Sequence, residues 1–171
     1  MSSSAIKLVG KRSLDFNRVY QIDLTKRMQI GSIPENILYD IFRDGRAIGL
    51  IIEHLVQYEF SGLTRVCGDE SSAFDLIKTD FRIPVRIQCK TFKDDSCKLC
   101  PSKMLGKGRK FDLDGFNEYL EKIDSYLLVK NSDFPRLKIL LLNKSSIVSY
   151  ASINESGAAI KKTVLNELFE R

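Results

Sequence analysis

The stretch that most constrains the fold of this chain is residues 73–92. Two runs rich in apolar residues flank a short polar turn closed by Pro84, and this pattern is typical of a β-hairpin. Polar and apolar residues alternate in the second run, so Gln88 and Lys90 lie on the same face of the predicted strand. Pairing within the hairpin can bring Asp75, from the first run, beside both of them.

A carboxylate, an amide oxygen and an ammonium would then meet at one point on a rigid sheet. Such a group suits a hard divalent cation with an activated water next to it. The spacing Asp-x12-Gln-x-Lys is short, however, and solvent-facing strands also carry it by chance. The rest of the chain therefore has to decide between a functional site and an ordinary exposed strand.

The composition predicts one folded domain. The chain has 171 residues, of which 43% are hydrophobic and 29% are charged, as in an ordinary globular protein. No apolar run approaches the roughly 20 residues that cross a bilayer, and the N-terminus lacks the apolar core of a secretory signal. Four cysteines without an export signal favour reduced thiols. We therefore expect a cytoplasmic protein without a membrane partner.

Charge divides the chain into two predicted parts. Residues 1–31 hold six basic and two acidic residues and are interpreted as a basic N-terminal arm, in which residues 19–24 can form an edge strand. Residues 32–171 form the predicted single domain. The formal net charge of +5 favours a polyanionic partner, although many proteins without such a partner have a similar excess.

Two helices are predicted before the hairpin. The first begins with a capping box at residues 32–35 and ends near residue 42, and the second covers about residues 46–59. Glu53 lies beside the apolar stripe of the second helix, where a buried carboxylate needs a partner. Two interpretations stay open. Either Arg46, a salt bridge or plain exposure explains Glu53 without a function, or Glu53 leans over the hairpin and helps to hold the cation.

The remaining pattern predicts an α/β fold with a central mixed β-sheet flanked by helices. A strand over residues 63–67 precedes the hairpin, a helix covers residues 111–123, and residues 125–129 and 137–142 are apolar enough for central strands. The chain ends in an amphipathic helix with an inward apolar face made of Ile160, Val164, Leu165, Leu168 and Phe169.

Three segments together resemble the PD-(D/E)xK nuclease superfamily. They are Glu53 on the helix, Phe74-Asp75-Leu76-Ile77 on one strand and Arg86-Ile87-Gln88-Cys89-Lys90-Thr91 on the next. The similarity is to the variant with a Gln-x-Lys motif, found in intron-encoded homing endonucleases and some small restriction enzymes. It covers about residues 45–142 in topology and residues 45–92 in motif. The resemblance implies a restriction-endonuclease-like core with the element order αβββαβ.

The resemblance also implies roles for four residues. Asp75 corresponds to the metal-binding aspartate, Lys90 to the catalytic lysine and Glu53 to the helix carboxylate, while Gln88 stands where the family usually has an acid. Asp75, Gln88 and Glu53 would hold the metal. Phe74 replaces the proline of the family name. Because the Gln88 amide adds no negative charge, the number of metal ions per site stays open.

The implied reaction is hydrolysis of phosphodiester bonds in double-stranded DNA by an activated water, with Mg²⁺, or alternatively Mn²⁺, as cofactor. Site-specific cleavage of both strands, as in restriction or homing, favours a homodimer. Two alternatives remain. One is a non-catalytic nucleic-acid-binding or assembly module that has lost its second acid, and the other is a junction resolvase or RNA nuclease. Asp69 and Asp80 are nearby acids that we interpret as loop residues.

The segment between Ser96 and Phe111 contains basic residues and no acid. It either grips the DNA backbone or forms a solvated loop. Its basic residues are Lys98, Lys103, Lys107, Arg109 and Lys110. Cys97 and Cys100 have the spacing of zinc ligands, but no second pair follows them, so a zinc site is not predicted.

Overall fold

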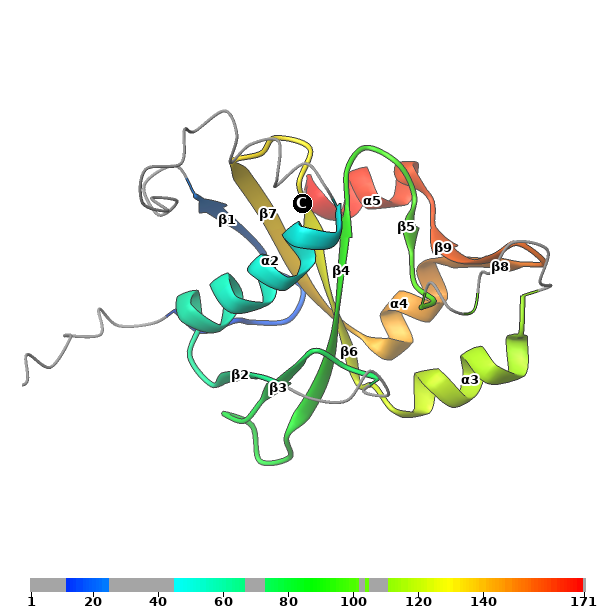
Figure 1. Cartoon of the computed structure of the whole chain (residues 1–171), viewed down its shortest axis with the longest axis horizontal. Coiled ribbons are helices and arrows are strands. Elements are labelled where there is room, and N and C mark those ends of the chain that lie inside the picture. The colour runs from blue at the N-terminus through cyan, green and yellow to red at the C-terminus, as the bar shows by residue number, and fades with distance from the viewer. Residues whose placement is uncertain (1–11, 25–44, 67–72, 102–103, 105–110, 171) are drawn as a thin grey trace, which may run out of the picture.

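A mixed six-stranded β-sheet forms the centre of the computed structural model (Figure 1). The structure describes residues 12–24, 45–66, 73–101, 104 and 111–170. The strand order is β1-β7-β6-β4-β3-β2. The strands of this sheet are β1 (Val19–Asp23), β2 (Leu63–Arg65), β3 (Leu76–Lys78), β4 (Val85–Phe92), β6 (Ser125–Lys130) and β7 (Arg136–Asn143). The α/β class with a central mixed sheet, predicted from the sequence, is confirmed.

The predicted hairpin is present as strands β3 and β4. They pair antiparallel with Leu76 opposite Ile87, and the Asp75 N–H extends the pairing by donating to the Ile87 carbonyl at 3.0 Å. Strand β4 then pairs in parallel with β6, which is antiparallel to β7. The strands predicted over residues 125–129 and 137–142 are therefore confirmed as central strands.

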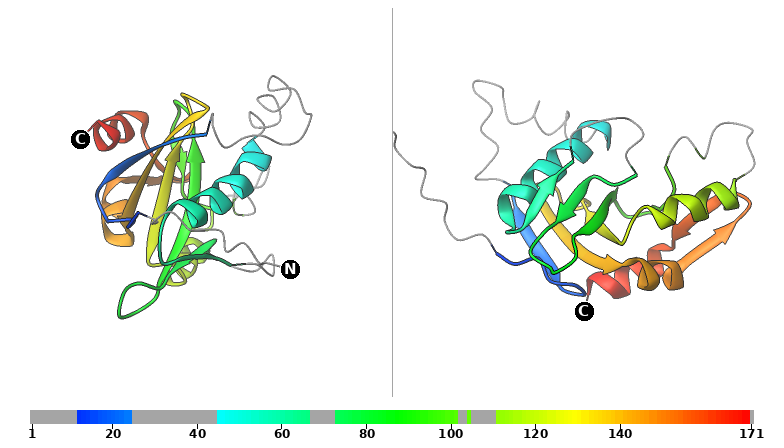
Figure 2. Two further views of the ribbon diagram at one scale, coloured as in Figure 1. Left: turned by 90° about the vertical axis from the view of Figure 1, so that its left-hand side faces the viewer. Right: turned by 90° about the horizontal axis from the view of Figure 1, so that it is seen from below.

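Helix α2 (Gly45–Glu59) covers one face of the sheet, as the left view of Figure 2 shows. It matches the helix predicted over residues 46–59. Ile48, Ile52 and Val56 recur at a spacing of four residues and are buried against the sheet. The alternate strand residues that face α2 include Ile87 on β4.

The opposite face is covered by three further helices and a small second sheet. The helices are α3 (Leu113–Glu121), α4 (Lys144–Tyr150) and α5 (Lys162–Phe169), and the second sheet contains β5 (Cys97–Lys98), β8 (Ala151–Asn154) and β9 (Gly157–Ile160) in the order β5-β9-β8. Helix α3 begins where the Asp112 carboxylate accepts the Gly115 N–H at 2.9 Å, and α4 begins where the Asn143 side chain accepts the Ser146 N–H at 2.8 Å.

The structure differs from the sequence prediction at both ends. Ile160 belongs to β9 and not to the C-terminal helix, which starts at Lys162. The prediction assigned residues 12–24 to the N-terminal arm, but in the structure they are part of the folded domain. They include the predicted edge strand β1, and the side chains of Leu14 and Leu24 are buried in the core. The helix predicted from residue 32 to about 42 lies outside the described residues. Among the described helices, none is long and apolar enough to cross a membrane.

The tip of the hairpin contains an ion pair between a buried lysine and a partly exposed aspartate. The Lys78 side chain is 1% exposed, its ammonium lies 2.5 Å from the Asp80 carboxylate, and it also lies 5.0 Å from the ring centroid of Phe81. A Cβ atom on Gly62, which has a φ of +69°, would meet the Asp80 side chain at 2.6 Å. The hairpin tip and the turn between α2 and β2 therefore pack closely around this pair.

We expect Asp80→Ala to destabilise the protein by about 2–3 kcal/mol, because it leaves the Lys78 ammonium buried without its partner. Lys78→Met removes the charge and keeps the apolar stem, so it should be neutral or stabilising. The double variant should resemble Lys78→Met. Urea unfolding of the three variants checks this order, and a milder effect of Asp80→Ala than of Lys78→Met would contradict it.

A candidate active site on the central hairpin

The predicted aspartate and glutamine meet across the hairpin. The Gln88 side-chain N–H donates a hydrogen bond to the Asp75 Oδ2, and the same oxygen accepts the Cys89 backbone N–H at 2.9 Å. Asp75 is half-buried, just before β3, and lies opposite β4. The hairpin register predicted from the sequence therefore brings Asp75 beside Gln88, as expected.

Gln88 is also held by helix α3, which contains no residue of the family motif. The hydroxyl of Tyr119, on α3, donates to the Gln88 Oε1 at 2.9 Å. The amide is thereby oriented at both ends, with its N–H toward Asp75 and its carbonyl toward Tyr119. A carbonyl oxygen has two lone pairs, so the Tyr119 hydrogen bond leaves one of them for another partner.

Lys90 lies on the same face of β4 as Gln88 and is half-buried. Burial lowers the pKa of the Lys90 ammonium, because removal from water disfavours its charged form, and the nearby Asp75 carboxylate opposes this effect. The Cys97 thiol lies close enough for Lys90 to influence its titration, and burial raises the pKa of Cys97 to about 12. Lys90 is thus within electrostatic reach of both Asp75 and Cys97.

The Asp75 carboxylate is also disfavoured in its charged form. Burial raises the pKa of Asp75, while the Cys89 N–H and the charges of Lys90 and Arg65 act to lower it. The pKa of the half-buried Asp75 carboxylate is thus raised and that of the half-buried Lys90 ammonium is lowered, so the two values are shifted toward each other. Such shifts are frequent at catalytic sites, although structural ion pairs also produce them.

Glu53 stands on the α2 side of this group and has a partner that the sequence did not reveal. Its carboxylate accepts a hydrogen bond from the Arg65 Nε at 2.8 Å, and both side chains are largely buried. Burial raises the pKa of Glu53, and Asp75 is close enough for its negative charge to add to this increase. The interpretation that Glu53 is simply exposed is wrong. The Arg46 side chain lies outside the described part of the structure.

The described donors fit a divalent cation only sparsely. Within the described residues, no group of three or more His, Cys, Asp or Glu side chains is arranged to hold a metal ion. Mg²⁺ binds through one or two carboxylates and retains several waters, and Asp75 has its second oxygen, Oδ1, without a hydrogen bond from the described residues. A magnesium ion that relies on Asp75, neighbouring oxygens and water is compatible with this donor set.

The predicted DNA-binding residues are only partly described. Lys98 lies exposed on β5, whereas Lys103, Lys107, Arg109 and Lys110 lie outside the described residues, as does Asp69. Asp80, the other nearby acid, is held by Lys78 at the far tip of the hairpin.

Two residues of the site were missed by the sequence reasoning, namely Tyr119 and Arg65. Tyr119 lies within the helix predicted over residues 111–123, but the helical pattern does not indicate which strand residue it contacts. Arg65 is the last residue of the short strand β2 and belongs to no motif. Only the fold shows that Arg65 pairs with Glu53 and that Tyr119 pairs with Gln88.

Comparison of this chain with models of protein families, with curated proteins and with solved structures finds no match. The geometry of the hairpin therefore carries the functional argument.

The raised pKa of Asp75 predicts how the stability of the protein depends on pH. The folded state takes up a proton on Asp75 at a higher pH than the unfolded state, whose value is near 3.8. As the pH falls from neutral toward about 4, wild type should therefore gain stability relative to Asp75→Asn, because only wild type binds this proton. Urea unfolding of both proteins across this pH range measures the difference.

The control variant is Asp114→Asn, which removes an exposed carboxylate from the first turn of α3. Subtracting its effect removes the general influence of net charge. The difference in the free energy of unfolding between wild type and Asp75→Asn could instead stay constant on acidification, or shift in favour of the variant. Either result would show that Asp75 is not desolvated in solution.

Proposed function

We propose that the protein is a metal-dependent endonuclease that hydrolyses phosphodiester bonds in double-stranded DNA, with the hairpin as its catalytic element. The observation that carries the proposal is the hydrogen bond between Gln88 and Asp75, with Lys90 on the same face of β4 as Gln88 and within electrostatic reach of Asp75. The order α2, β2, β3, β4, α3, β6 also follows the αβββαβ order of a restriction-endonuclease-like core, with the short strand β5 added between β4 and α3.

The side chains have distinct roles in this proposal. Asp75 holds the divalent cation, Mg²⁺ or Mn²⁺, with the Gln88 carbonyl or Glu53 as a further oxygen ligand. When bound, the cation supplies a Lewis acid for the phosphate and lowers the pKa of a bound water. Lys90 orients the attacking water and stabilises the negative charge that develops on the phosphate. Its lowered pKa also suits it to exchange a proton with that water.

Tyr119 and Arg65 support these groups. Tyr119 fixes the Gln88 amide, which in turn fixes the Asp75 carboxylate, so the geometry is set before a substrate arrives. Arg65 holds Glu53 beside the hairpin and adds a second positive charge near Asp75. Cleavage of both DNA strands requires two such sites, which is why we propose that the protein acts as a homodimer.

The second candidate function is a nucleic-acid-binding module without catalysis. It is favoured by the sparse set of acids, because no cluster of three metal-ligating side chains occurs in the described part of the chain. The two candidates differ in one measurable property, which is cleavage of supercoiled plasmid in the presence of Mg²⁺.

We expect Asp75→Asn and Lys90→Met to lower the cleavage rate by at least ~100-fold, in line with the loss of an electrostatic or proton-transfer contribution. Both substitutions nearly preserve side-chain volume, so the melting temperature should not fall. Plasmid cleavage with Mg²⁺ and thermal unfolding provide the two readouts. Asp114→Asn and Lys122→Met, both at exposed positions of α3 or its end, are matched controls that should cleave normally.

If both active-site variants cleave plasmid like wild type, Asp75 and Lys90 are not catalytic. If wild type itself does not cleave plasmid, RNA or a branched DNA with Mg²⁺ or Mn²⁺, the non-catalytic candidate replaces the nuclease.

Variants of Gln88 test whether a neutral amide is a ligand. Gln88→Glu restores the acid that the family usually has, so it should retain activity and lower the Mg²⁺ concentration needed for half-maximal cleavage. Gln88→Ala should be less active than Gln88→Glu, because it loses both the ligand and the hydrogen bond to Asp75. Cleavage across a Mg²⁺ titration measures both effects. Undiminished and equal activity of the two variants would place Gln88 outside the metal site.

A further inference from the structure

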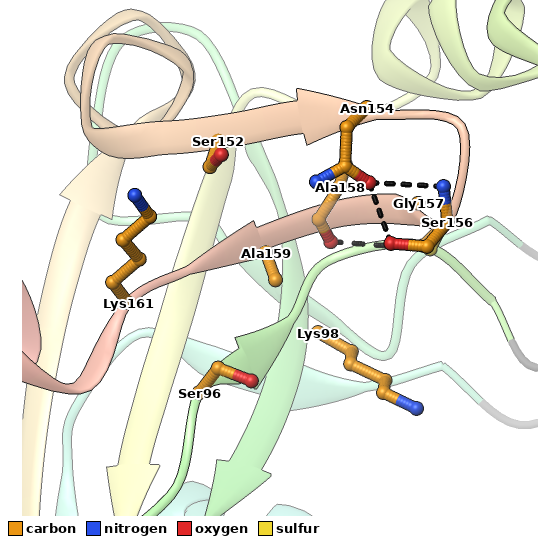
Figure 3. A pocket seen from close by; sticks show the side chains of 10 residues that line it. Ser96, Lys98, Ser152, Asn154, Ser156, Gly157, Ala158, Ala159 and Lys161 are labelled. Carbon is orange, nitrogen blue, oxygen red and sulfur yellow. Dashed lines mark hydrogen bonds between the residues drawn. The ribbon is translucent and has the colours of Figure 1, made fainter.

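A polar pocket lies over the small second sheet, on the outer side of β5 (Figure 3). It encloses about 250 Å³ and is lined by residues of β5, of β8 and β9 and of the turn that joins them. Its lining contains two lysines, Lys98 and Lys161, and several hydroxyl and amide groups, but no carboxylate. Figure 3 shows the two lysines at opposite sides of the pocket.

The charged side chains that line this pocket are both lysines, and this charge suits an anion. Lys98 and Lys161 are exposed, and neither forms an ion pair with any residue that the structure describes. The hydroxyls of Ser96 and Ser152 also line the pocket. The rim is fixed by the β8–β9 turn, in which the Asn154 side chain accepts the Ser156 N–H at 2.9 Å.

The floor of the pocket lets a ligand approach the backbone closely. Gly157, Ala158 and Ala159 follow one another along β9 beneath it. Gly157 has a φ of 132°, which side-chain-bearing residues rarely adopt, so a glycine is needed where β9 begins. The small side chains keep the space above the strand open.

A second polar pocket of about 270 Å³ adjoins the first, because Ser96 and Lys98 line both. It extends to Lys93 and to Thr91, the residue that follows Lys90 on β4. Asp95 is the only acid that lines it. The two pockets together form what we call the β5 groove, which runs from the catalytic strand to Lys161.

Strand β5 separates the β5 groove from the candidate active site. The Cys97 side chain is buried and lies near Lys90 on the inner side of the strand, whereas Lys98 is exposed on the outer side. Alternation along a strand places adjacent side chains on opposite faces. The groove and Lys90 are thus on the two sides of one short strand.

We propose that the β5 groove binds the phosphodiester backbone of the DNA next to the cleavage site, an inference that rests on the proposed nuclease function. Each pocket is smaller than the roughly 300–1,000 Å³ of typical small-molecule sites, so each suits a phosphate group and not a whole cofactor. The continuity of the two pockets favours a chain of phosphates over a single anion. Lysine ammonium groups and hydroxyls are the usual backbone contacts in DNA complexes, and they carry no sequence preference.

The test compares two double variants that remove the same charge. Lys98→Gln with Lys161→Gln empties the β5 groove of two lysines, whereas Lys122→Gln with Lys162→Gln removes two exposed lysines that line neither pocket. Binding of a fluorescent 20-base-pair duplex is measured in EDTA over a range of salt concentrations. The groove variant should flatten the slope of log K against log salt by about two units, and the control variant should not.

Each result is decisive. The proposal is overturned if the groove variant keeps the wild-type slope or if wild type does not bind the duplex. It is also overturned if both double variants flatten the slope by the same amount. It is equally overturned if only inorganic phosphate, and not the duplex, binds in a manner that depends on Lys98 and Lys161. Because EDTA removes the metal, this readout is independent of cleavage. A flattened slope together with full activity of Asp75→Asn would leave the groove in place and remove the proposed catalytic site.

Discussion

The pairing register of β3 and β4 is the constraint on which the rest of the structure depends. With Leu76 opposite Ile87, both apolar side chains face α2, and Asp75 and Gln88 are left to meet on the other face. A slip of one residue would turn Ile87 out of the core and Gln88 into it, so burial of Leu76 and Ile87 strongly selects the observed register. The apolar core thereby positions the polar site, and no separate device is required to bring the carboxylate and the amide together.

The position of the hairpin within the sheet is fixed by a second set of contacts at the start of β4. The Arg86 guanidinium donates to both carboxylate oxygens of Asp124 at 2.9 Å, and the Arg86 backbone N–H donates to the same carboxylate. Asp124 directly precedes β6, so this pair sets the parallel alignment of β4 and β6. That alignment determines where α3 crosses the sheet and therefore where Tyr119 meets Gln88. Local hydrogen bonds at one end of the strand thus control the site at its centre.

Much of this arrangement can be predicted from the sequence, and the failures have a common cause. Period-two alternation identified the hairpin and its polar face, and period-3.6 patterns identified α2, α3 and α5, because each of these segments buries one face. Helix α4 and the β8–β9 hairpin were missed. They are short, their residues are mostly small or polar, and only Ile147 in α4 is fully buried. The partners Arg65 and Tyr119 could not be predicted either, since a contact between distant segments leaves no trace in the local pattern.

The charges around Asp75 limit how a cation can bind there. Two carboxylates, Asp75 and Glu53, and two cations, Lys90 and Arg65, are near enough to influence the charge of Asp75 or Glu53, so their charges balance before any metal enters. In the family that the motif resembles, the position of Gln88 is usually an acid, which would make the site negative. On the proposed function, Mg²⁺ would meet little net attraction from the protein alone, and the negative phosphate of the DNA would supply the missing charge. Metal and DNA would then bind cooperatively, because each reduces the electrostatic cost of placing the other beside the half-buried Lys90 and Asp75.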